Sequence, residues 1–408
     1  FMRMTVFRFL ELAKEFLIHK NLQRNSLLKE TLLLDELNFR ELNNLTIKSV
    51  KELEKIIEKK TVKDADFYFA KYRMEYFRND VKARDTKFLT YKDTLDEHLM
   101  LEQEYLNIFF FTNSLRFFQY FLNQKNFVVN AGGYPEFMNN ILEYLKSHDE
   151  YLKVKVLKVY FCLVLLLINK DDKYFFDLKK ILFEDKGELS YVVKFDLIAV
   201  LRNYGQEKLN KGNEEFVNII FDILKFSIDK NLLTPSQDGK YISETRFMNI
   251  VWSGLTANEL DWTQAFIKKY INRVESGKRE YVYAYNAARL EFEKANYPAA
   301  LEKLGKSGPI KNIFYKAAVK HLTLMIYYEL KWLIPASDLM DAYKHFIRTD
   351  KLLPDMYKTH INLFLNYYNR LLKINDKAEN YIFELSELIA ELKTTSQGWL
   401  LKKAKELE

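Results

Sequence analysis

Apolar residues recur at intervals of three and four through nearly every segment of this chain, which is the period of an amphipathic helix. The run from Asp64 to Val81 is typical, with Phe67, Tyr68 and Tyr72 forming an aromatic stripe. No segment shows the strict alternation of apolar and polar residues that a half-buried strand requires. The 408 residues include only 11 Gly and 6 Pro, too few for the turns of an all-β protein or the phosphate loops of a doubly wound α/β fold. The sequence therefore predicts an all-α fold.

Turn residues interrupt this pattern at intervals short enough for antiparallel helix pairs, and we expect about eighteen helices. Beyond a first helix around Phe7 to Leu17, the expected ranges are 27–42, 47–57, 64–81, 91–122, a helix from Tyr134, then 149–169, 172–183, 189–210, 213–230, 241–256, 259–275, 279–295, 297–304, 311–332, 335–348, 355–373 and 376–394. Gly132 and Gly133 separate an N-terminal region, residues 1–130, from residues 131–408, and we expect one repeat array to continue across this join. A domain boundary between Asn123 and Gly133 is the alternative.

Composition and charge narrow the class of protein. The chain is 48% hydrophobic and contains 32 Phe, 27 Tyr and 4 Trp, which excludes disorder over most of its length. Lys and Arg number 63 against 56 Asp and Glu, and positive and negative residues are interspersed, unlike the concentrated positive charge of most nucleic-acid binders.

Cys162 has no disulfide partner and lies in a ten-residue apolar run, too short for the roughly 20 residues of a membrane span. We expect no export signal and a cytoplasmic location. Because Phe1 stands before Met2, we also expect natural residues to precede it.

A longer period is visible around residue 300. Tyr285-Asn286-Ala287-Ala288, Phe292, Asn296-Tyr297, Ala300-Leu301 and Leu304 place small residues where two helices would cross. Counting from Ala300, the equivalent position is expected at Ala265, 35 residues earlier, and at Ala336, 36 residues later. A more degenerate copy has Gly205 at the crossing and Gly212-Asn213 in the turn.

These residues resemble the tetratricopeptide repeat, whose period is about 34 residues. The stretches 261–267, 285–301 and 326–330 also make the chain similar to uncharacterised bacterial proteins of this helical-repeat type. Glu291 departs from the pattern, since the repeat usually has an aromatic residue there, and residues 1–190 lack clean signature residues. The resemblance implies an α-α superhelix, a solenoid of antiparallel helix pairs, and implies no activity.

No pattern in the sequence indicates catalysis, a cofactor or a metal. Residues 300–307 match a relaxed P-loop pattern but coincide with an expected helix, where Gly305 is better explained as a helix cap. The six histidines never fall at a metal-ligand spacing. Cys162 has apolar neighbours, which favour an inert buried thiol. Acidic pairs such as Asp171-Asp172 stand at expected helix starts, where they complement the helix dipole.

Two surface features remain as candidates for partner binding. From Lys303 to Tyr328 the chain has no acidic residue but carries Lys303, Lys306, Lys311, Lys316 and Lys320, of which Lys316 and Lys320 share one helix face. A solvated helix face is the default explanation, and a basic ridge formed together with Lys344, Arg348 and Lys351 is the functional one. Core packing is the default expectation for any single tyrosine, and surplus tyrosines on the first helices of the pairs are the candidates for lining a concave groove. The residues expected to contact a partner are Tyr281, Tyr285, Asn286, Arg289, Lys316, Lys320 and Tyr327.

The function expected from these features is recognition of another protein or a peptide by the concave face of a helical-repeat superhelix, without enzymatic activity. Nucleic-acid binding along the basic ridge is the alternative from a second class, and it differs in its steep salt dependence. A regulatory or sensor region of a longer chain is the third interpretation.

Overall fold

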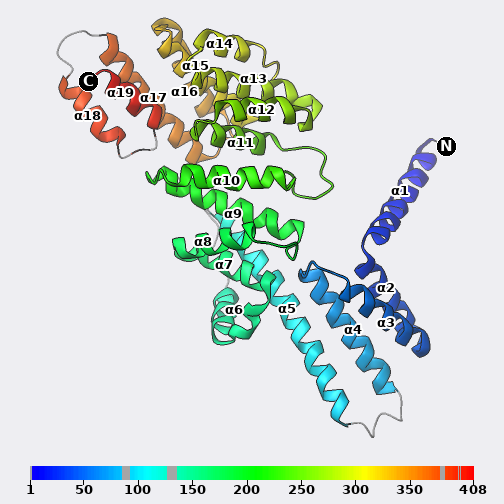
Figure 1. Ribbon diagram of the computed structural model, residues 1–408. Helices are drawn as coiled ribbons and strands as arrows, with labels where there is room; N and C mark the ends of the chain where they lie inside the picture. Colours follow the sequence, from blue (N-terminus) through cyan, green and yellow to red (C-terminus); the bar gives the residue numbers. More distant parts are fainter. Residues whose placement is uncertain (1, 85–91, 126–135, 377–381, 394, 396) are drawn as a thin grey trace. The chain divides into compact units, whose positions relative to one another are not determined.

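The computed structural model describes residues 2–84, 92–125, 136–376, 382–393, 395 and 397–408 (Figure 1). All regular structure in these ranges is helical, which confirms the predicted all-α class. The chain divides into two compact units, residues 1–201 and 202–408. The boundary expected near residue 130 falls in 126–135, outside the described residues.

Unit 1 contains eight helices in its described part and the first half of a ninth. They are α1 (Met2–Arg24), α2 (Ser26–Phe39), α3 (Asn43–Glu58), α4 (Ala65–Arg84), α5 (Lys92–Lys125), α6 (Glu136–Ser147), α7 (Lys155–Asn169), α8 (Asp172–Phe183) and α9 (Tyr191–Asn210). The long helix expected over 91–122 is the single helix α5, which packs along α4 and contacts α7 (Figure 1). A 3-10 helix, Asp149–Lys153, precedes α7 where one continuous helix was expected.

Unit 2 contains the rest of α9 and ten more helices among its described residues. They are α10 (Phe216–Asp229), α11 (Glu244–Thr256), α12 (Leu260–Tyr270), α13 (Ser276–Glu293), α14 (Tyr297–Gly305), α15 (Ile313–Glu329), α16 (Leu333–Thr349), α17 (Asp355–Asp376), α18 (Ile382–Leu392) and α19 (Gly398–Glu406). A 3-10 turn, Ile271–Arg273, follows α12. The sequence did not predict α19, whose residues follow the last expected helix.

Three antiparallel hairpins of unit 2, α11/α12, α13/α14 and α15/α16, share one turn geometry. A residue with a left-handed backbone, φ between 56° and 60°, ends each first helix: Asn258, Ala295 and Lys331, spaced 37 and 36 residues apart. The next N–H donates to the carbonyl oxygen five residues earlier at 2.8 to 2.9 Å, a Schellman closure that satisfies a terminal carbonyl. Unit 1 contains the same turn between α2 and α3, where Glu41 has φ 56° and Leu42 donates to Leu37 at 3.0 Å.

The fourth residue of each second helix lies in the core. Thr46, Thr263, Ala300 and Ala336 occupy this position and are fully buried. Thr263 faces Gly254 of α11, where an added Cβ would overlap the threonine hydroxyl. The prediction that Ala265 is the equivalent of Ala300 is therefore wrong: Ala265 is exposed, and Thr263 takes the place two residues earlier. The predicted crossing at Gly205 is confirmed, since a Cβ there would lie 2.7 Å from Ile220.

Buried tyrosines join neighbouring helices of unit 2 through their hydroxyl groups. Tyr343 on α16 donates to the carbonyl of Ala317 at 2.9 Å, and Tyr368 on α17 donates to that of Leu324 at 2.6 Å. Tyr315 on α15 donates to the carbonyl of Glu244 at 3.0 Å. Each ring fills an interface between helices while its polar end is satisfied, which explains how a core can hold so many tyrosines.

Candidate functional site

The tyrosines and the amide expected to line a groove lie inside unit 2. Tyr281, Tyr285 and Asn286 on α13 are only 2%, 7% and 1% exposed. The Tyr281 hydroxyl donates to Glu244, and the Asn286 amide donates to the Val282 carbonyl at 2.7 Å. The rings of Tyr281 and Tyr285 contact Tyr315 edge to face. These side chains hold α11, α13 and α15 together, and their burial leaves them no surface for a partner.

Arg289 lies between three helices. Its guanidinium pairs with Glu293 at 2.7 Å, lies over the Trp252 ring and approaches the Met325 sulfur at 3.8 Å. Trp252, Arg289 and Met325 are spaced by 37 and 36 residues, so they are equivalent positions of the three hairpins. Of these three, only Trp252 is substantially exposed.

The expected basic ridge is partly neutralised. Lys316 is exposed, but Lys320 is half-buried beside Phe346, and burial lowers its pKa. Lys306, which follows the last residue of α14, pairs with Glu302 of that helix, and Lys344 pairs with Asp341. The region therefore holds less uncompensated charge than the sequence suggests.

Tyr327, the last expected contact residue, is half-buried and its ring lies 5.7 Å from that of Trp332. This pair covers the turn between α15 and α16, where the Trp332 N–H donates to the Tyr327 carbonyl. A structural role in the turn therefore accounts for Tyr327.

The residues considered for chemistry lie where packing explains them. Cys162 is buried, and burial raises the pKa of its thiol to about 11. His321 lies against Phe364, and burial lowers its pKa to about 3, with Arg289 and His360 contributing. Gly305 is the last residue of α14, so the P-loop match is helical. Within the described ranges there is no cluster of three His, Cys, Asp or Glu side chains suited to a metal ion.

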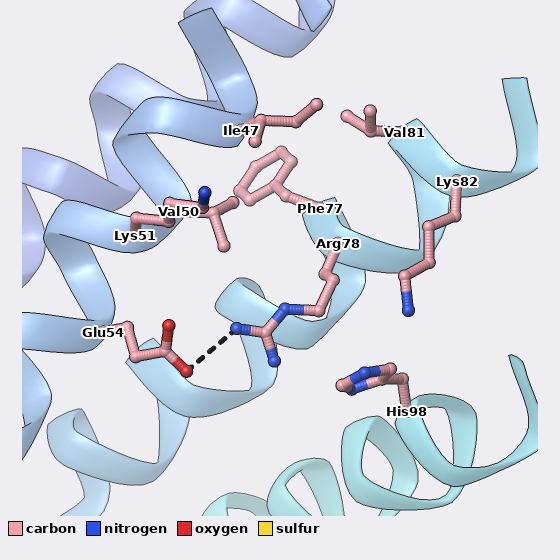
Figure 2. Close-up of a pocket in the computed structure, with 9 residues that line it drawn as sticks. All are labelled: Ile47, Val50, Lys51, Glu54, Phe77, Arg78, Val81, Lys82 and His98. Atoms are coloured by element: carbon pink, nitrogen blue, oxygen red, sulfur yellow. Dashed lines mark hydrogen bonds and ion pairs between the residues drawn. The ribbon is translucent and has the colours of Figure 1, made fainter. Parts of the chain in front are cut away.

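A pocket of about 370 Å³ opens in unit 1 between α3, α4 and α5 (Figure 2). Its wall is apolar on one side and charged on the other. The apolar lining residues are Ile47, Val50, Phe77 and Val81, and the polar ones are Lys51, Glu54, Arg78, Lys82 and His98. Helical spacing brings these groups to one place, because residues three and four apart share a face.

Two carboxylates satisfy the arginine in this pocket. Arg78 pairs with the buried Glu75 at 3.0 Å and with Glu54 across the helix interface at 3.1 Å. Glu75 also contacts His98 of α5 at 2.8 Å. This network ties α3, α4 and α5 together, so Arg78 supports the wall of the pocket.

Two lysines frame the opening from opposite walls. Lys51 is exposed on α3 and Lys82 is half-buried on α4, with the Phe77 ring between the two helices (Figure 2). Burial and the neighbouring Arg78 lower the pKa of Lys82, and the opposing attraction of Glu75 and Glu97 does not compensate. The charged state of this ammonium therefore has less stabilisation than it would have in water.

The pocket continues into a shallower groove. This groove has a volume of about 590 Å³, and Ile47 and Val81 line both hollows. Its other lining residues are Glu41, Leu42, Asn43, Asn44, Leu45 and Arg84. Because the two hollows share Ile47 and Val81, a ligand can reach from the apolar lining of the first to the more polar lining of the second.

Sequence reasoning did not find this site, because unit 1 lacks clean repeat signatures. Two signals were present: Ile47, Lys51 and Glu54 share one face of α3, as do Arg78 and Lys82 on α4. Neither signal says which helices meet, so the pocket became visible only in the fold.

Comparisons with protein-family models, curated proteins and solved structures found no match to this chain. No helix in the described part of the chain has the length and apolar character to cross a membrane.

Proposed function

We propose that this chain is a protein-binding helical-repeat protein without catalytic activity, whose hairpins stack into a right-handed superhelix of the tetratricopeptide type. The observation that supports this architecture is the recurrence of one turn geometry at Asn258, Ala295 and Lys331. Helix α13 contacts α11 and α12 of the preceding hairpin, and α15 contacts α13 and α14 in the same way. Units that repeat the same neighbour contacts form an elongated surface, and such surfaces serve recognition.

The α3–α4–α5 pocket is the proposed binding site, and its occupant is a segment of a partner protein. The apolar wall accepts a side chain such as leucine or phenylalanine. Glu54 and the buried Glu75 pair with Arg78 in the wall, and the exposed ammonium of Lys51 at the rim favours a segment with negative charge. The groove past Ile47 and Val81 gives the rest of the segment a surface to follow.

Nucleic-acid binding is the less favoured alternative, because ion pairs at Lys306 and Lys344 reduce the charge available for phosphates. A bound nucleic acid would be released steeply by moderate salt, whereas a segment held by an apolar side chain would not.

Peptide display against the intact chain tests the proposal. Ile47 is 43% exposed and lines both hollows, so Ile47→Asp should disrupt binding without unfolding the chain. Leu32 on α2 is 47% exposed and lines neither hollow, which makes Leu32→Asp the matched control. We expect selected peptides to combine an apolar residue with Asp or Glu, and to lose binding only to Ile47→Asp. Peptides that bind both variants equally, or retention of nucleic acid alone, would contradict the proposal.

A further inference from the structure

We propose that two copies of this chain associate by pairing their N-terminal helices, because α1 (blue in Figure 1) exposes a wide apolar face. Helix α1 contacts α2, but none of its described side chains, those of residues 4–24, is buried. Its large apolar side chains are between 51% and 69% exposed: Met4, Val6, Phe7, Phe9, Leu10, Leu12, Phe16, Leu17 and Ile18. The α3–α4–α5 pocket is lined by other helices, so α1 presents a second surface.

The apolar face of α1 consists of residues at positions a, d and e of two successive heptads: Val6, Phe9, Leu10, Ala13, Phe16 and Leu17. This spacing places them along one side of the helix and is typical of helices that pack against others. The Lys20 ammonium, 5.6 Å from the centre of the Phe16 ring, marks the end of the face. Outside the face, Lys14 pairs with Glu11 at 2.7 Å, and Phe7 lies on the same side as these two residues.

The exposed area of this face is sufficient for an interface between two copies. Most of the stability of a helix in a protein comes from packing of its apolar face, so covering this face would stabilise α1. Each large side chain of the face exposes roughly 100 Å², which gives roughly 600 Å² per copy when Leu12 at its edge is included. Two paired copies would therefore bury about 1,200 Å² in total, at the lower end of the range for specific interfaces.

A second copy fits this face better than a lipid surface. Helices that lie on anionic bilayers carry Lys and Arg on their polar side, whereas here Glu11 and Glu15 offset Arg8 and Lys14. Apolar residues at a and d of successive heptads are suited to packing against an identical helix, and twofold symmetry lets the same residues serve both partners. An interface of this size predicts a dissociation constant on the order of 10 µM.

Sedimentation of the intact chain at concentrations from about 1 to 100 µM tests the proposal, since this range brackets the expected dissociation constant. We expect the mass to rise from that of one chain to that of two. Phe9→Asp places a carboxylate in the interface once per copy and should weaken association at least about 100-fold. The matched control is Phe7→Asp, the same substitution outside the face of the same helix, at a residue 63% exposed against 69% for Phe9. It should leave association nearly unchanged.

Disulfide cross-linking locates the contact on α1. Ala13→Cys introduces a thiol near the middle of the face, and Glu11→Cys introduces one outside it. The natural Cys162 is buried and does not compete in the folded chain. Oxidation should convert Ala13→Cys into a covalent dimer, because paired helices bring the two thiols within bonding distance, and should leave Glu11→Cys mostly uncross-linked.

Three results would overturn the proposal. The first is the mass of a single chain over the whole concentration range. The second is a dimer that Phe9→Asp leaves intact, which would place the contact on another surface. The third is a chain that stays monomeric but binds phosphatidylserine vesicles and loses this binding in Phe9→Asp, which would make a lipid surface the occupant of the face.

Discussion

The loop between α8 and α9 is held by one buried carboxylate, and its removal gives the sharpest stability prediction for this chain. The side chain of Asp185 is 1% exposed and pairs with Lys155 at 2.9 Å and with Lys194 at 3.0 Å. It also accepts hydrogen bonds from the backbone N–H groups of Gly187, Glu188 and Leu189, each at 3.2 Å. Asp185 therefore joins the start of α7, the loop and α9.

Asp185→Asn keeps the shape of the side chain and removes its charge. Both half-buried lysines then lose the Asp185 carboxylate, although Lys155 keeps its ion pair with Glu188 at 3.4 Å, and one side-chain oxygen becomes a donor group facing other donors. Hydrogen bonds to charged groups contribute about 1.5–3 kcal/mol each, and breaking a buried pair costs about 3–5 kcal/mol. Because both lysines still reach solvent, we expect a loss of about 3 kcal/mol in the free energy of unfolding of unit 1.

Urea denaturation followed with two probes measures this loss. All four tryptophans lie in residues 202–408, so their fluorescence reports unit 2, whereas far-UV circular dichroism reports helices of both units. Asp185→Asn should lower the unfolding midpoint seen by circular dichroism. The control Glu52→Gln, which removes an exposed ion pair with Lys55, should leave it unchanged. A midpoint for Asp185→Asn that matches the control would refute the reasoning.

The pH dependence provides a second check on the same residue. Burial alone would raise the pKa of Asp185, but hydrogen bonds from Lys155 and Lys194 and the Leu189 amide bring it below its ordinary value. A carboxyl with a depressed folded pKa stabilises the fold above its unfolded pKa, and this contribution disappears as pH falls through the folded pKa. The difference between wild type and Asp185→Asn should therefore shrink only below about pH 4.

Three other changes test the hairpin geometry and the core. Gly254→Ala should destabilise unit 2 by about 1–3 kcal/mol because the new methyl group overlaps Thr263, and tryptophan fluorescence in urea measures this. Ala295→Gly should raise the free energy of unfolding by about 0.5–1 kcal/mol, because glycine accepts φ 56° without strain. The control Ala299→Gly, inside α14, should lower the free energy of unfolding by a similar amount. Equal effects of the two substitutions would contradict the turn assignment. The Cys162 thiol, whose pKa burial raises to about 11, should react with a disulfide reagent only after denaturant is added, and rapid reaction of the folded chain would show that it is accessible.

The helical content and the hairpin turns could be read from the sequence because both depend on local chemistry. The spacing of apolar residues predicted the helices, and the turns at Gly212 and before Tyr297 lie where small or polar residues interrupt that spacing. The error at Ala265 has a simple cause. The repeat pattern predicts a small residue on the second helix at the crossing, but in α11/α12 the first helix supplies the space with Gly254, so the second helix can present Thr263.

The sequence patterns that predicted the helices could not predict that the expected contact residues are buried. Spacing places Tyr281 and Tyr285 on one face of α13, yet it does not say whether that face meets solvent or two neighbouring helices. The same limit applies to charge, since Lys316 and Lys320 share a face of α15 while only Lys320 lies beside Phe346 of α16.

The sequence by itself thus determined helices, turns and the faces of each helix, because backbone preferences and side-chain periodicity act over a few residues. Only the tertiary structure decided which faces meet, which cations are already paired and where a pocket opens. Arg78 and Lys82 show the difference: they stand one turn apart on α4 with the same formal charge. Glu54 of α3 and Glu75 of α4 pair with Arg78, whereas burial and the neighbouring Arg78 lower the pKa of Lys82, and these effects depend on distances that no spacing along the chain specifies.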